Sequence, residues 1–107
     1  MMSIGIKIKE ARLIRQMTQE ELAHKVGYTS RSAINKIEMG KVDIPATRIS
    51  ALANALGVSE KWLLDLDDED ADLSTLTLIY KGLKQEERKT LLSVAQALYK
   101  THEERHD

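Results

Sequence analysis

Apolar residues recur at intervals of three and four along most of the first 64 residues, with short polar breaks between the runs. This spacing is typical of amphipathic helices, and no alternating β-strand pattern is present. The sequence predicts helices over about 4–15, from Thr18 to Gly27, from Thr29 or Ser30 to Gly40, from Pro45 to Gly57, and briefly after Ser59. Thr18 and Glu21 have the spacing of a capping box, and the glycines suit the left-handed residue that closes a helix.

The chain after Leu64 has a different pattern. Residues 65–72 include six acidic side chains, and we interpret them as a solvated linker, with a frayed helix end as the alternative. Two further helices are predicted, over about 73–81 and 85–102, on either side of Gly82. Their apolar positions are Leu73, Leu76, Ile79 and Tyr80 in the first and Leu91, Leu92, Ala95, Leu98 and Tyr99 in the second.

Together these segments predict an all-α protein with a five-helix domain over residues 1–64, an acidic linker over 65–72, and a helical extension over 73–107. The amino-acid composition narrows the class of protein further. The 107 residues include no Cys, which excludes a disulfide scaffold and a thiolate metal site. No apolar run is long enough to cross a membrane, and Lys7 and Lys9 interrupt any signal-peptide core. We therefore expect a cytoplasmic protein.

Charge is unevenly distributed along the chain. Residues 1–64 carry ten Lys or Arg against six Asp or Glu, whereas residues 65–107 carry six against eleven. The net charge of −1 hides this asymmetry. Because binding to DNA depends on the local field at the interface, the basic first part is compatible with a nucleic-acid partner.

The segment from Thr18 to Gly40 has the features of two helices that place one of them in the DNA major groove. Its inward apolar side comprises Leu22, Ala23, Val26, Ile34 and Ile37. The outward polar positions of its second helix are Arg31, Ser32, Asn35 and Lys36. Gln19 opens the first helix, where its side chain and free backbone N–H groups can hold a phosphate.

Three stretches of sequence carry a family resemblance: TQEELAHKVG, SRSAINKIEMGK and LANALGVSEKWL. They resemble the helix-turn-helix domain of bacteriophage repressors and Cro proteins, the xenobiotic-response-element class, over about Ile6 to Leu64. The resemblance implies base contacts from Arg31, Ser32, Asn35 and Lys36. It implies phosphate contacts at Thr18, Gln19, Thr29, Lys41 and Thr47, and a structural salt bridge between Arg12 and Glu38.

One departure from the family pattern concerns the turn between the two helices. This chain has one more residue between Gly27 and Ile34 than the commonest pattern, so Tyr28, Thr29 and Ser30 make a longer turn. The extra residue affects the expected register of Arg31 and Ser32 on DNA more than that of Lys36. A solvated helix face is the alternative interpretation of Arg31, Lys36 and Lys41.

The apolar stripe formed by Leu91, Leu92, Ala95, Leu98 and Tyr99 is too apolar to leave exposed on a short helix. We expect it to form a homodimer, since one recognition helix reads only a few base pairs; packing onto the first domain is the alternative. The predicted function is a repressor that blocks polymerase at an inverted-repeat operator, with a protein antirepressor or a protease as a further partner. A protein-interaction module, such as an antitoxin or coactivator-like adaptor, is the second hypothesis. No residues suggest an enzyme, a metal site or a cofactor.

Overall fold

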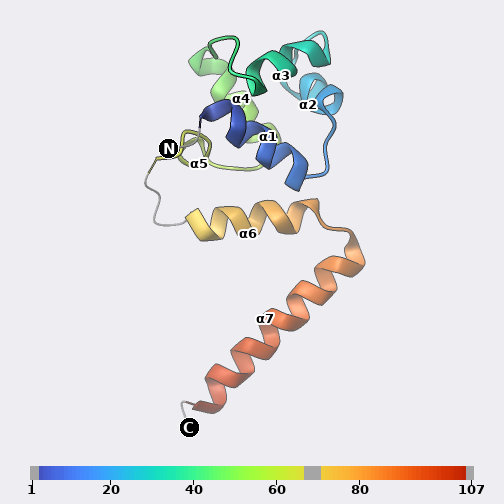
Figure 1. The fold of residues 1–107 in the computed structure, drawn as a ribbon. Helices are drawn as coiled ribbons and strands as arrows, with labels where there is room; N and C mark the ends of the chain where they lie inside the picture. Colours follow the sequence, from blue (N-terminus) through green and yellow to red (C-terminus); the bar gives the residue numbers. More distant parts are fainter. Residues whose placement is uncertain (1–2, 67–70, 106–107) are drawn as a thin grey trace.

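The computed structural model describes residues 3–66 and 71–105, and within these ranges the chain is all-α with no strand (Figure 1). The helices are α1 (Ile4–Ile14), α2 (Gln19–Val26), α3 (Arg31–Glu38), α4 (Ala46–Leu56), α5 (Glu60–Leu63), α6 (Ala71–Gly82) and α7 (Gln85–Arg105). The expected fold class, a five-helix domain followed by a helical extension, is confirmed. Among the described residues, no helix has both the length and the apolar character needed to cross a bilayer.

Helices α1 to α5 surround one apolar core. Its buried side chains in this part of the chain are Ile8, Ala11, Met17, Leu22, Ala23, Val26, Ile34, Ile37, Leu52, Ala53, Leu56, Trp62 and Leu63. Gly5 lets α1 approach α3 closely, because a Cβ at that position would overlap the carbonyl oxygens of Ile37 and Glu38. The first helix is thereby fixed against the carboxyl end of α3.

Helix limits in this domain follow the local signals of the sequence. Ser3 and Ser59 cap α1 and α5 by accepting hydrogen bonds from the backbone N–H groups of Ile6 and Trp62. Gly27 and Gly57 close α2 and α4 with φ values of 86° and 77°, in the left-handed region that favours glycine. The predicted boundaries of these helices agree with the structure to within one or two residues.

The segment expected to be a linker, 65–72, is only partly described. Residues 67–70 lie outside the described residues, and the last two residues of the segment, Ala71 and Asp72, belong to α6. Helix α6 therefore starts earlier than the apolar pattern predicts. Its acidic Asp72 lies in the first turn, where a negative charge interacts favourably with the helix dipole.

Helix α6 packs onto the first domain through a face that differs from the one expected. Leu73, Leu76, Ile79 and Tyr80 are all exposed, whereas Leu78 is fully buried in the same core as α1 to α5. Beside Leu78 on the helix lie Ala71, Ser74, Thr75 and Gly82. The expectation was wrong because this face consists of small residues, which contribute little apolar character but allow the helix to approach α1.

Three contacts join α6 to the first domain. Gly82 touches the end of α1, where a Cβ would overlap the carbonyl oxygen of Ile14. The side-chain amide of Gln16 donates to the carbonyl of Gly82 at 2.8 Å. The indole Nε1 of Trp62 donates to Thr75 Oγ1 at 3.1 Å. Helix α6 is thus an integral layer of the domain.

Helix α7 diverges from α6 after the turn at residues 83–84 and extends away from the other helices (Figure 1). Arg88 fixes the start of α7, since its guanidinium donates to the carbonyls of Tyr80 and Lys81 at 2.9 and 3.0 Å. Beyond that point the stripe is open: Leu98 and Tyr99 are 68% and 65% exposed. The alternative that this stripe packs onto the first domain is wrong for the described residues.

Candidate nucleic-acid interface

The two helices of the expected helix-turn-helix are α2 and α3, joined by the turn after Gly27. Thr18 caps α2, its Oγ1 accepting from the N–H of Glu21 at 3.0 Å, while the Glu21 carboxylate accepts from the N–H of Thr18 at 3.2 Å. This reciprocal pair fixes the direction in which the chain enters α2. Ile34 is fully buried and Ile37 nearly so, and they hold α3 against the core. The opposite face of α3 is therefore directed to solvent.

The four residues expected to contact bases all lie exposed on α3: Arg31, Ser32, Asn35 and Lys36. Ser30 is the N-cap of α3, but its side chain makes no capping hydrogen bond and pairs with the Ser32 hydroxyl at 2.8 Å. The N–H of Ala33 donates to the Ser30 carbonyl at 3.3 Å, and no side chain of Ser30 caps the other N–H groups of this first turn, a type of position that can accept a phosphate oxygen.

A buried ion pair supports this face from below. Arg12 Nε donates to Glu38 Oε2 at 2.7 Å and its terminal nitrogen donates to Oε1 at 3.1 Å. The Glu38 side chain is only 2% exposed, and Arg12 also donates to the carbonyl of Met17 at 2.9 Å. The expected pairing of Arg12 with Glu38 is thus present, and it links α1, the loop before α2, and α3.

Gln19 connects this ion pair to the exposed face. Its side-chain amide donates to Glu38 Oε1 at 3.0 Å and to Asn35 Oδ1 at 3.3 Å. Gln19 is only partly exposed, and Asn35 in turn contacts Met39 Sδ at 3.6 Å. Gln19 therefore braces Asn35, and its partly exposed side chain lies beside the exposed face of α3.

The remaining expected contact residues do not form a single cluster. Ser32 and Lys36 share a surface hollow with Thr29 and Arg48, whereas Arg31 borders a separate hollow beside Glu20 and His24 of α2. Thr18, Lys41 and Thr47 are exposed outside both hollows. Lys41 directly follows Gly40 (φ 71°) at the end of α3. Thr29 lines both hollows, so the hollow beside Arg31 adjoins the one that contains Ser32 and Lys36.

Arg48 is a residue that the sequence reasoning missed. Its guanidinium donates to the carbonyl of Val26 at the end of α2 and lies 4.6 Å from the centre of the Tyr28 ring. This clamp of Arg48 on Tyr28 holds the longer turn against α4. Two signals could have indicated it: an aromatic residue in an otherwise polar turn, and an Arg next to the position at which Thr47 was singled out.

Comparison with known proteins agrees with this geometry. A helix-turn-helix family profile matches residues 8–63, which is more than half of the chain. The chain therefore belongs to the helix-turn-helix family, the DNA-binding class of transcriptional regulators to which the Cro and repressor proteins belong.

The chain is also similar to a particular protein of Bacillus subtilis (strain 168), the SPbeta prophage-derived uncharacterized HTH-type transcriptional regulator YonR. The two are 33% identical over 91 residues, which is 78% of this chain and 83% of the relative. Because 78% of the chain is more than residues 1–64, the similarity extends beyond the five-helix domain into the residues that follow it.

Proposed function

We propose that the chain is a cytoplasmic, sequence-specific repressor that binds an inverted-repeat operator as a dimer. The operator overlaps a promoter, so the bound dimer blocks access of polymerase. The observation that carries this proposal is the polar face of α3, which is exposed yet held over a buried network. Arg12, Glu38 and Gln19 restrict how α3 can move. A face that must read base edges needs this kind of preorganisation.

Within this proposal, Arg31, Ser32, Asn35 and Lys36 contact base edges. Phosphate oxygens are held by Thr18, Gln19, Thr29, Lys41 and Thr47. The two sets have different consequences, since base contacts specify sequence and phosphate contacts position the protein. The excess of basic residues in 1–64 supports the backbone contacts, and the name of the prophage-derived relative supports a role in transcription. Residues 73–107 supply the dimer contact, and an antirepressor or a protease releases the operator.

Selection of bound sequences from a random pool of duplex DNA tests this proposal. We expect enrichment of an inverted repeat whose half-sites lie about one helical turn apart, roughly 34–36 Å. Affinity for the selected duplex should fall steeply with salt, with a slope that counts the phosphates neutralised. Failure to enrich any sequence at low salt would contradict the proposal.

The second candidate, a protein-interaction module, is favoured by one observation: the exposed apolar surface of α6 and α7. The two candidates respond differently to salt, because apolar association is not weakened by added salt whereas phosphate contacts are. The module would be favoured over the repressor if the protein bound a protein partner tightly but did not bind duplex DNA at a low salt concentration of about 50 mM.

A further inference from the structure

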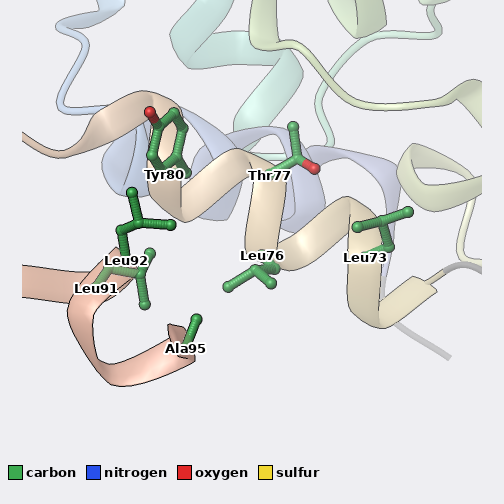
Figure 2. Close-up of a pocket in the computed structure, with 7 residues that line it drawn as sticks. All are labelled: Leu73, Leu76, Thr77, Tyr80, Leu91, Leu92 and Ala95. Atoms are coloured by element: carbon green, nitrogen blue, oxygen red, sulfur yellow. The ribbon is translucent and has the colours of Figure 1, made fainter. Parts of the chain in front are cut away.

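The extension contains an apolar groove that the helix-turn-helix domain does not fill. It lies between α6 and α7 (Figure 2) and is lined by Leu73, Leu76, Thr77, Tyr80, Leu91, Leu92 and Ala95. Leu73 is 60% exposed and Leu92 is 55% exposed. Leu76 and Tyr80 are exposed as well, so the described part of the chain leaves much of this groove open to solvent. Water contact with so many apolar groups is unfavourable.

We propose that the groove receives α7 of a second copy of this chain, with the two α7 helices antiparallel and crossing at Ala95. This inference deepens the proposed function, because it specifies how the dimer is built. In this arrangement Leu98 and Tyr99 of each copy enter the groove of the other, beside Leu92 and Leu91.

The sequence of the stripe carries the antiparallel assignment. Leu92 and Leu98 lie three residues before and after Ala95, and Leu91 and Tyr99 lie four residues before and after it. A two-fold antiparallel pair centred on Ala95 therefore puts Leu92 opposite Leu98 of the partner, and Leu91 opposite Tyr99. These reciprocal contacts make the antiparallel pair self-complementary, as a two-fold interface requires, whereas a parallel pair would put Leu92 opposite Leu92 of the partner. The small side chain at the centre lets the two helix axes approach where they cross.

The shape of the extension also fits a helix as the occupant. Helices α6 and α7 diverge from the turn at residues 83–84 (Figure 1), and apolar side chains of both helices line the hollow between them. A helix seated in this hollow would contact both α6 and α7. Tyr80 and Leu76 on α6 would then be covered by the same partner helix that covers Leu92.

Charge does not oppose pairing of two copies. Residues 71–105 carry six Lys or Arg and five Asp or Glu, so the extension is nearly neutral, and the acidic excess lies in 65–72.

Disulfide trapping in the full chain tests the register. The sequence contains no Cys, so introduced cysteines report only designed contacts. We expect Ala95→Cys to form a disulfide-linked dimer under mild oxidation. An equimolar mixture of Leu92→Cys and Leu98→Cys, one carrying a mass tag, should give several-fold more mixed dimer than either self-linked dimer. Ser93→Cys, on the opposite face of α7, is the matched control and should link only at background level.

Sedimentation of unmodified and charged variants tests the assembly itself. Wild type should sediment at twice the monomer mass of 12.1 kDa, Leu98→Glu at the monomer mass, and Ser93→Glu as wild type. An excess of self-linked Leu92→Cys dimer over the mixed dimer would indicate a parallel pair of α7 helices and would overturn the proposal. A wild type that stays monomeric would overturn it too and would leave the groove to another protein.

Failure of this inference can be told apart from failure of the proposed function. Trapping of the 92–98 pair without any selected DNA sequence would retain the dimer and reject the repressor. Selection of a single half-site by a monomeric protein would retain sequence reading by α3 and reject the antiparallel α7 pair.

Discussion

The helix-turn-helix domain and α7 differ in how far their apolar side chains are exposed to solvent. In α1 to α5, most large apolar side chains lie in a common core, and Asn35 on the exposed face of α3 accepts a hydrogen bond from Gln19. In α7, by contrast, Leu92, Leu98 and Tyr99 are more than half exposed. Helix α6 is intermediate in burial, since Leu78 lies in the core whereas Leu73 is exposed to solvent. In one part of the molecule the apolar side chains are covered within the single chain, whereas in the other the described residues leave an apolar face open to solvent.

This difference assigns different tasks to the two parts. A surface that reads DNA must keep its geometry before the DNA arrives, and the Arg12–Glu38 pair supplies that rigidity from inside the domain. A surface that associates with another chain must instead remain open until the partner is present. Substitutions in the first part should therefore alter stability or DNA preference, whereas substitutions along α7 should alter assembly.

The largest effect is expected at Glu38. Glu38→Ala would leave the Arg12 guanidinium buried without its counter-ion, which costs about 3–5 kcal/mol in the free energy of unfolding. Urea denaturation followed by circular dichroism measures this loss. Glu20→Ala, an exposed Glu→Ala change on α2, is the control and should unfold like wild type. If Glu38→Ala unfolds like wild type but no longer discriminates between sequences, the role of Glu38 is in recognition.

The second largest effect is expected at Leu78, where α6 packs into the core of the first domain. Leu78→Ala removes a fully buried side chain and should reduce the free energy of unfolding by about 2–5 kcal/mol. Trp62 is the only Trp, and its indole is bonded to Thr75 of α6, so its fluorescence should shift to longer wavelength when α6 detaches. Ile79→Ala on the same helix is the control, since Ile79 is 38% exposed, does not line the groove between α6 and α7, and should change the free energy of unfolding less. Equal losses from the two variants would show that α6 does not belong to the core.

The contrast between the two parts also explains what could be predicted from the sequence. Signals in the first domain are local: the Thr18–Glu21 capping box and Gly27 define α2 within a few residues of chain. The Arg12–Glu38 pair spans 26 residues, and only the family resemblance implied it. The exposed positions of α3 followed from helical periodicity once Ile34 and Ile37 were assigned to the core.

Other features depend on contacts that leave no periodic signal. The packed face of α6 consists of Ser74, Thr75 and Gly82 around Leu78. These small residues let α6 approach α1 closely, and the spacing of apolar residues does not reveal such a contact. The clamp of Arg48 on Tyr28 joins α4 to the turn after α2. Such contacts are set by the tertiary arrangement of the helices rather than by the order of residues within one helix.

A smaller effect should separate the two kinds of DNA contact. Lys36→Ala should lose about 1–3 kcal/mol of discrimination at one position of each half-site, because it removes a contact to a base edge. Lys41→Ala should weaken binding to all sequences about equally and lower the salt slope by about one. Both are exposed Lys→Ala changes, so each serves as the control for the other. Binding measured against a panel of single-base operator variants tests the difference, and identical profiles for the two variants would contradict it.

The smallest effect is expected at the Arg48–Tyr28 clamp. Arg48→Ala removes a cation–π contact and a hydrogen bond to Val26, with an expected loss of about 1 kcal/mol in the free energy of unfolding. Because the longer turn leads directly into α3, discrimination at the bases near Arg31 should weaken more than at those near Lys36. Arg48→Lys keeps the charge but loses the planar stacking group, so it distinguishes positioning from simple attraction to phosphate. Operator-variant binding at fixed salt measures the outcome: if Arg48→Lys restores wild-type discrimination in full, then charge alone accounts for Arg48, and the turn does not depend on the clamp.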